Sequence, residues 1–132
     1  MPLFSEHGFV VGEPAENVVR LAMGSTRTGA DLGPFHRWCN EVRAIVKFAH
    51  SRTGKKVRVL VDGSGITSYD PATLKELAGL IGETEPHIER IAVFGLTSSL
   101  RAVEEVIIAL SGMDRIKNFD TEESAEAWTV AP

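Results

Sequence analysis

The chain has 132 residues, 43% of them hydrophobic, and its 14 Lys and Arg against 18 Asp and Glu give a formal net charge of −4 at pH 7. A chain of this size can bury a core without disulfides or a structural metal, and its mild acidity argues against a dedicated DNA- or RNA-binding protein. No stretch approaches the ~20 apolar residues of a membrane span and no signal peptide opens the chain, so we expect one cytoplasmic domain over residues 1–132, with its core at 9–128.

The first half of the chain contains two predicted strands and a long helix. Phe9–Val11 predicts a short strand that passes through a turn at 12–14 into a longer strand at Val18–Met23. A helix follows, with Asp31 as its predicted N-cap and Gly54 as its C-terminal glycine. Its apolar residues recur at helical spacing and are expected to face the core: Phe35, Trp38, Cys39, Val42, Ile45, Val46 and Ala49.

The second half alternates strands and helices. Val57–Val61 and Ile91–Phe94 are nearly continuous in β-branched and aromatic residues, as in strands covered on both faces, whereas Arg115–Phe119 alternates with charge and predicts an edge strand. The helix that begins at Asp70-Pro71 is expected to end at Gly82 and to bury Leu74, Leu77, Ala78 and Ile81. The next one, from Ser98 or Ser99 to Gly112, is expected to bury Leu100, Val103, Ile107 and Leu110. The last helix is expected to follow Asp120, with Glu123 completing a capping box, and to direct Ala125 and Trp128 toward the core.

This alternation predicts an α/β fold, a single-domain, mainly parallel β-sheet of four to five strands with about four helices packed on it, because crossover connections join parallel strands. Near the N-terminus, apolar residues are expected either to cover the sheet or to pair with a second copy of the chain in a homodimer: Phe4, Phe9 and Val10.

The most distinctive segment is 62–74, which leaves a buried strand, turns, and enters a helix. In open α/β sheets this edge is where ligands usually bind, and helix N-terminal amides favour anions. The segment also has a purely structural interpretation, in which the glycines allow a turn, an aspartate caps the helix and the hydroxyls face water. The candidate residues for binding a partner or an anion are Asp62, Ser64, Gly65, Thr67, Asp70 and Thr73.

Several kinds of chemistry are disfavoured. The glycines of 63–65 have neither the dinucleotide-binding nor the P-loop pattern, and Ser64 lacks the spacing of a nucleophile elbow. Asp62 has no acidic residue at the neighbouring strand ends to share a magnesium ion, and the four histidines show no zinc-ligand spacing. Cys39 lies on the apolar stripe of its helix, and as the single cysteine it excludes an internal disulfide. The sequence therefore predicts no enzyme, no metal and no cofactor.

Residues 1–56 carry a positive balance, to which helix positions 43 and 47 contribute neighbouring charges. Such a basic face is either simply solvated or binds an acidic partner. The residues concerned are Arg37, Arg43, Lys47, Arg52, Lys55 and Lys56.

A family resemblance rests on segment 62–74. The stretch resembles the pattern Asp-x-Ser-Gly-(Ile/Val)-Thr-x-x-Asp-Ser-Ser-Gly-Leu of the STAS superfamily, the SpoIIAA-like anti-sigma-factor antagonists. The positions that match in order are Asp62, Ser64, Gly65, Ile66, Thr67, Asp70 and Leu74. The segments 91–95 and 119–128 also resemble the family, most closely its divergent branch labelled STAS/SEC14.

One departure from the pattern concerns phosphorylation. In phosphoswitched members, the second serine after the motif's second aspartate accepts phosphate from an anti-sigma kinase. That position here is Ala72, which has no oxygen, between Pro71 and Thr73. Transfer of the switch to Ala72 is therefore excluded, and Thr73, in the first helical turn, is the alternative acceptor that the residues leave open.

The resemblance and the missing catalytic groups together predict a non-enzymatic regulatory or scaffolding domain. It is expected to bind a protein partner through residues 62–74 and the helix that follows, without the phosphoswitch. The alternative, implied by the SEC14 label, is a domain that binds a small lipophilic or anionic ligand. That alternative requires an apolar cavity in the core.

Overall fold

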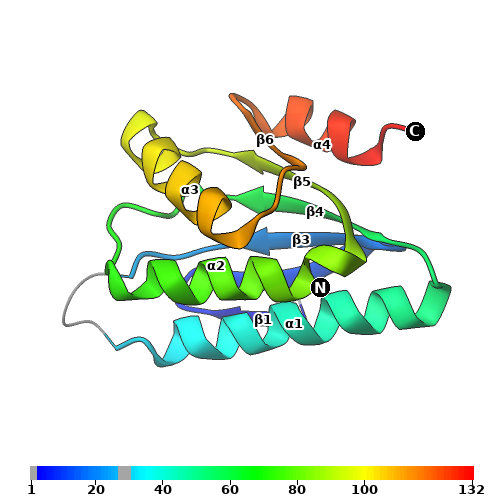
Figure 1. The fold of residues 1–132 in the computed structure, drawn as a ribbon, viewed down its shortest axis with the longest axis horizontal. Helices are drawn as coiled ribbons and strands as arrows, with labels where there is room; N and C mark the ends of the chain where they lie inside the picture. Colours follow the sequence, from blue (N-terminus) through cyan, green and yellow to red (C-terminus); the bar gives the residue numbers. More distant parts are fainter. Residues whose placement is uncertain (1–2, 27–30) are drawn as a thin grey trace.

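The computed structural model of the chain describes residues 3–26 and 31–132 (Figure 1). The strands in this part are β1 (Phe4–Glu6), β2 (Phe9–Ala15), β3 (Val18–Ala22), β4 (Val57–Asp62), β5 (Ile88–Phe94) and β6 (Ile116–Phe119). The helices are α1 (Gly33–Thr53), α2 (Ala72–Thr84), α3 (Ser98–Ser111) and α4 (Glu122–Val130), with one 3₁₀ turn, η1 (Glu85–His87).

The strands form one six-stranded sheet in the order β1-β2-β3-β4-β5-β6. The α/β class and the four helices are as expected, but the prediction of a mainly parallel sheet of four to five strands is wrong. β1, β2 and β3 pair antiparallel, and only the pairs from β3 to β6 are parallel, so the sheet is mixed. Two tight hairpins cause the difference, and both contain residues with positive φ: His7, Gly8 and Asn17.

β2 is also longer than expected. It continues through the segment 12–14, where a turn was predicted, because a register shift between Gly12 and Ala15 accommodates the extra length. Phe9 is only 3% exposed and its ring lies against Phe35 and Trp38, with ring centroids 6.1 and 5.8 Å away. The N-terminal aromatic residues therefore pack on α1, and pairing with a second copy stays a prediction.

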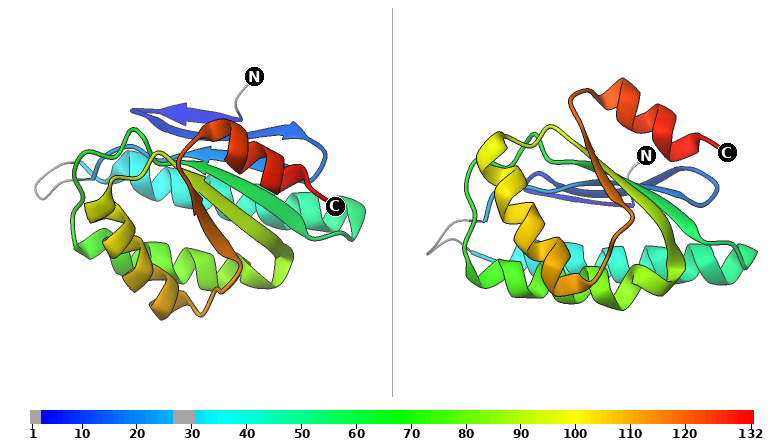
Figure 2. Two further views of the ribbon diagram at one scale, coloured as in Figure 1. Left: turned by 90° about the horizontal axis from the view of Figure 1, so that it is seen from above. Right: turned by 45° about the horizontal axis from the view of Figure 1, so that its top comes forward.

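The helices lie on both faces of the sheet (Figure 2). α1 and α2 cover one face, α3 lies beside α2, and α4 covers part of the opposite face. The main core lies under α1 and α2, and a smaller cluster under α4 contains Leu60, Ala92, Phe94 and Ala125.

The prediction for α1 is confirmed at its C-terminus and on its buried face. Every apolar residue expected to face the core is buried, and Gly54 ends the helix with φ 72°, its N–H donating to the His50 carbonyl at 2.7 Å. At the N-terminus, Leu32 takes the cap position that was predicted for Asp31, whose carboxylate accepts the N–H of Gly33 at 2.8 Å.

The basic residues of α1 are paired within the chain. Glu83 of α2 accepts from Arg43 Nε at 2.6 Å and from Lys47 Nζ at 2.9 Å. Arg37 pairs with Glu6, and Arg52 with Glu13. These side chains therefore join elements of the fold, which weakens the interpretation of a basic face that awaits an acidic partner.

The later helices depart from expectation at particular residues. α2 passes Gly82 and ends at Thr84, whose hydroxyl donates to the Leu80 carbonyl at 2.8 Å. α4 is capped by Thr121 in place of Asp120, since Thr121 Oγ1 accepts the N–H of Ser124 at 3.2 Å. Leu110 of α3 is 64% exposed, although burial was predicted, because α3 packs chiefly on α2 and turns this residue away.

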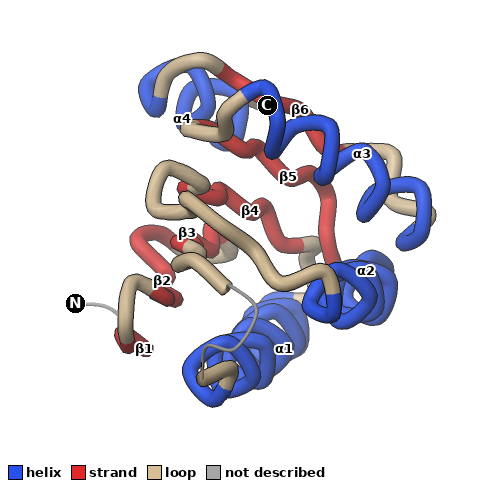
Figure 3. The backbone as a smooth tube through the Cα atoms, turned by 90° about the vertical axis from the view of Figure 1, so that its left-hand side faces the viewer, coloured by secondary structure: helices blue, strands red, loops and turns tan. Residues whose placement is uncertain are grey.

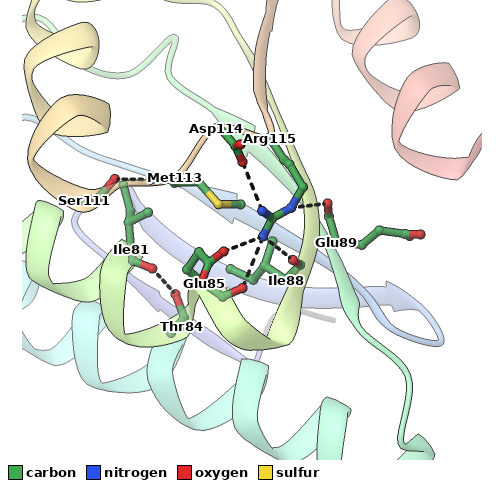
Figure 4. A network of polar contacts seen from close by, with 9 residues as sticks. All are labelled: Ile81, Thr84, Glu85, Ile88, Glu89, Ser111, Met113, Asp114 and Arg115. Carbon is green, nitrogen blue, oxygen red and sulfur yellow. Dashed lines mark hydrogen bonds and ion pairs between the residues drawn. The ribbon is translucent and has the colours of Figure 1, made fainter.

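Arg115 ties the end of α2 to the strands (Figure 4). Its guanidinium donates to the Glu89 carbonyl at 3.0 Å, to the Ile88 carbonyl at 3.0 Å and to the Glu85 carboxylate at 2.9 Å. This residue precedes β6, so one side chain fixes η1 and β5 relative to the edge strand.

α4 is attached at both ends. Arg20 of β3 donates to the Glu122 carboxylate at 2.8 Å at the start of the helix. At its end, Arg58 donates to the carbonyls of residues 129 and 131, and Arg90 to that of Trp128 at 2.8 Å. Cations near these carbonyls also interact favourably with the helix dipole. In the part of the chain that the structure describes, no helix is both long and apolar enough to cross a membrane.

Candidate functional site

The loops after β3, β4 and β5 meet at the carboxyl ends of the parallel strands, the edge that faces the viewer in Figure 3. The backbone ladder continues into these loops. The N–H of Met23 donates to the Asp62 carbonyl at 3.3 Å, and that of Gly63 donates to the Phe94 carbonyl at 2.9 Å. Segment 62–74 thus begins from a backbone fixed by its neighbours.

A close backbone approach at this edge requires glycine. Gly95, directly after β5, has φ +84°, and a Cβ there would lie 2.8 Å from Ser64 N and 2.9 Å from Ser64 Cβ. Both the conformation and the space exclude a side chain. Gly95 therefore lets the loop that carries Ser64 lie directly against the end of β5.

Two residues that sequence reasoning missed hold the segment from the other side. Ser25 Oγ accepts the N–H of Thr67 at 2.8 Å, and it lies 3.0 Å from Thr67 Oγ1. Thr26 donates its N–H to the Ser68 carbonyl at 3.1 Å, and its hydroxyl accepts the N–H of Asp70 at 3.3 Å. The only sequence signal for them is a pair of hydroxyl residues after a predicted strand.

Asp62 and Ser64 form a local pair. One carboxylate oxygen of Asp62 accepts both the N–H of Ser64, at 2.9 Å, and its hydroxyl, at 2.6 Å. The other oxygen lies 3.9 Å from Arg20 Nη2. This arrangement shapes the turn, and among the described residues the Asp62 carboxylate is the only group bonded to the Ser64 hydroxyl. Among the described residues, no group of three or more His, Cys, Asp or Glu side chains is placed to hold a metal.

Pro71 takes the N-cap position of α2 that was predicted for Asp70, and the helix begins at Ala72, so Asp70 lies one residue before the cap. Its carboxylate accepts the N–H of Ala72 at 3.0 Å, and its carbonyl accepts the N–H and the hydroxyl of Thr73, at 2.9 and 2.7 Å. Thr73 is only 1% exposed, so it lies beneath the surface, and its predicted part in binding stays a prediction. The bonds of its hydroxyl to the Asp70 carbonyl and to Thr26 draw it inside.

The surface at this edge is made by the remaining residues of the segment. Asp62 and Asp70 are half-buried, whereas the residues exposed to solvent are Ser64, Gly65, Thr67, Tyr69, Pro71 and Ala72. The structure therefore brings the candidate residues together, with Thr73 beneath the surface and the others on it.

A cavity that the sequence did not reveal lies on the helical side of the sheet. Its volume is about 160 Å³, and its walls come from α1, α2, α3 and the strands β3 to β6. The lining is almost wholly apolar, with representative residues Trp38, Val59, Leu77, Ile81, Val103 and Ile107. The cavity is partly open to solvent, so it is a recess between the helices and the sheet and not an enclosed void.

Glu104 of α3 lines this cavity. Its carboxylate accepts a hydrogen bond from the side-chain amide of Asn118 on β6. Burial raises the pKa of Glu104 above its usual value, against the opposing effects of the Asn118 hydrogen bond and the Arg101 charge.

Burial likewise raises the pKa of Cys39 to about 12, which leaves its thiol protonated and unreactive at neutral pH.

The comparisons with known proteins agree with this architecture. The SpoIIAA-like family model matches residues 18–129. Among solved structures, an uncharacterized protein of the DUF3478 family with a SpoIIAA-like fold, from Shewanella loihica PV-4, superposes with a TM-score of 0.66 at 14% identity, covering 96% of this chain and 97% of that chain. No curated protein matches the chain.

The anti-sigma factor antagonist SpoIIAA in its unphosphorylated form has a TM-score of 0.57 at 16% identity, covering 91% of this chain and 94% of that chain. The Bacillus cell fate determinant SpoIIAA in the phosphorylated form has a TM-score of 0.56 at 16% identity, covering 91% of this chain and 97% of that chain. At these identities the likeness shows the fold alone.

The close approach at Gly95 gives a first testable prediction. We expect Gly95→Ala to lower the free energy of unfolding by about 2 kcal/mol or more, because φ is positive there and the new Cβ would meet Ser64. Gly79→Ala, in the middle of α2 with no atom near its Cβ, should instead raise it by about 0.5–1 kcal/mol. Urea denaturation measures the free energy of unfolding of both variants. A change of the same sign and size in the two would contradict the prediction.

A second prediction concerns pH. Because the folded-state pKa of Glu104 is raised above 4.5, the folded chain loses stability as pH rises from that value through the raised pKa. Glu104→Gln removes this loss, so the variant should melt at a higher temperature than the wild type at pH 7.5, and the difference should shrink at pH 4. Melting curves at the two values test this, with Glu105→Gln on the exposed side of α3 as the control. A pH-independent difference would contradict it.

Proposed function

This chain belongs to the SpoIIAA-like family, and from that premise we propose that it is a non-enzymatic regulatory or scaffolding domain that binds a protein partner. The binding surface is the edge formed by residues 62–74 together with α2. The partner is bound without the phosphorylation switch of the phosphoswitched family members.

The observation that carries this proposal is the hydrogen bonding that holds the backbone of an exposed edge. Ser64, Thr67 and Ala72 are exposed, yet their backbone N–H groups are bonded to Asp62, Ser25 and Asp70. A surface already held in one conformation loses little entropy on binding, which favours affinity for a partner of matching shape. Helix α2 continues this surface, and its N-terminal turn begins at the exposed Ala72.

Two features support a surface that works without phosphorylation. Ala72 stands exposed at the position of the acceptor serine and has no hydroxyl. The next hydroxyl, that of Thr73, is buried and donates to the Asp70 carbonyl at 2.7 Å. A kinase would have to open the start of α2 to reach it.

The non-enzymatic part of the proposal rests on the bonding of the groups at this edge. The Ser64 hydroxyl donates to Asp62, and the Thr67 and Thr73 hydroxyls are paired with Ser25 and Thr26. Among the described residues, no histidine or lysine is bonded to these hydroxyls, and the one carboxylate that is, Asp62, also accepts the Ser64 N–H. The hydroxyls here are used to hold loops together.

The partner surface is tested with the double variant Ala72→Glu/Lys75→Glu. Both positions are exposed, and an acidic residue in the first turn of α2 interacts favourably with the helix dipole, so the variant should fold. We expect recovery of the partner, after cross-linking in source cells and affinity purification, to fall at least about tenfold.

The matched control is Glu126→Lys on the outer side of α4, on the opposite face of the sheet. A partner that binds the proposed surface is recovered with this variant as with the wild type. Recovery of the same proteins at the same level by the double variant would refute the proposal.

A second candidate function, the binding of a small lipophilic ligand, is favoured by the cavity. An engineered apolar cavity of about 150 Å³ in another protein stays dry and binds benzene. The cavity of about 160 Å³ here has a comparable volume and a similarly apolar lining, and it is partly open to solvent. The ligand would therefore have an apolar part about as large as a benzene ring.

Toluene provides the test of this second function. We expect titration calorimetry to show saturable binding to the wild type and none to Val103→Phe, in which a ring added to α3 fills part of the cavity. Val106→Phe adds the same volume one turn away, at a residue that is 52% exposed, and should bind as the wild type does. Absence of binding to the wild type would exclude this function.

A further inference from the structure

The polar groups of the cavity wall differ in whether they are hydrogen-bonded within the protein. The Thr84 hydroxyl donates to the Leu80 carbonyl at 2.8 Å, and Trp38 Nε1 donates to the Val10 carbonyl at 3.1 Å. The Thr73 hydroxyl donates to the Asp70 carbonyl. Among the described lining residues, Glu104 is the only one with a carboxylate or a cation. The wall is therefore apolar except for Glu104 on α3 and for Tyr69, whose ring carries a hydroxyl, in the loop before α2.

Next to Glu104, the hydrogen bonding is incomplete. The Asn118 amide donates to the Glu104 carboxylate, but its own Oδ1 is buried and has no partner among the described residues. The same is true of Nε of Arg101, one turn before Glu104 on α3, whose other nitrogen donates to Asp120 at 3.0 Å. Buried polar atoms are rarely left unpaired, and each such atom costs free energy.

We propose that the cavity binds a neutral molecule with a benzene-sized apolar part and a single hydroxyl group, which hydrogen-bonds to Glu104. This inference rests on the second function proposed above and adds the chemistry of the ligand. The apolar part contacts the side chains of α1, α2 and the strands, and the hydroxyl lies on the α3 side of the cavity.

The charges around Glu104 explain why the polar group is neutral. Glu104 and the adjacent Glu105 are acidic, and Arg101 is already paired with Asp120. A ligand carboxylate would thus lie beside another carboxylate in a partly buried place, where repulsion is weakly screened. An ammonium group would carry a charge into an almost wholly apolar lining, where the loss of its hydration costs far more than that of a hydroxyl. A hydroxyl can donate to the Glu104 carboxylate without this cost.

The experiment compares three probes of nearly the same shape: benzyl alcohol, toluene and benzoate. Each is titrated by calorimetry into the full chain and into Glu104→Leu, with Glu105→Leu as the control on the exposed side of the same helix. The measured quantity is the ratio of the benzyl alcohol affinity to the toluene affinity. We expect Glu104→Leu to lower this ratio about tenfold, Glu105→Leu to leave it unchanged, and the wild type to show no benzoate binding.

The outcomes separate this inference from the function on which it rests. Toluene binding with an unchanged ratio in Glu104→Leu, or benzoate binding as tight as that of benzyl alcohol, would overturn the inference and leave the second function standing. Failure of the wild type to bind toluene would overturn both. If Glu104→Leu does not fold, Glu104→Gln replaces it, and benzoate binding should then appear because the repelling charge is gone.

Discussion

The backbone ladder of the parallel strands does not stop where the strands end, and the arrangement of the candidate site depends on this. Met23 bonds to Asp62 and Gly63 bonds to Phe94 beyond the regular pairing. Since these are main-chain bonds, the loops take their positions from the sheet before any side chain contributes. Ser25 and Thr26 then fasten the segment from one side, and the bare backbone of Gly95 lets it lie against the other. The result is an exposed surface with little freedom of its own.

Much of the fold could be predicted from hydrophobic periodicity, because apolar residues recur at regular spacing along each helix and strand. The buried stripe of α1 and the apolar β4 and β5 are unambiguous in the sequence. The N-terminal hairpin was missed because its turn is made by His7 and Gly8, and only the folded backbone shows that both have positive φ. Leu110 satisfied the helical pattern yet lies in solvent, because periodicity marks an apolar face and does not say whether a neighbour covers it.

The candidate site was predictable in its position and less so in its detail. The segment 62–74 stood out by its glycines and hydroxyls, but Thr73 turned inward because Asp70 and Thr26 offer its hydroxyl partners. Ser25 lies about forty residues from its partner Thr67, so no local pattern links them. The cavity could not be predicted from the sequence. The same pattern of apolar residues is expected whether their side chains pack tightly against one another or leave a cavity between them.

The attachment of α4 has a consequence for how the chain acquires its structure during synthesis. Arg58 and Arg90 lie on the central strands, yet the carbonyls that bind them belong to residues 128–131. During synthesis, β4 and β5 are made before α4, so the apolar surface of Leu60, Ala92 and Phe94 lacks the cover of this helix until residues 122–130 follow. Docking of α4, held by these two arginines, is thus the step that covers this part of the sheet.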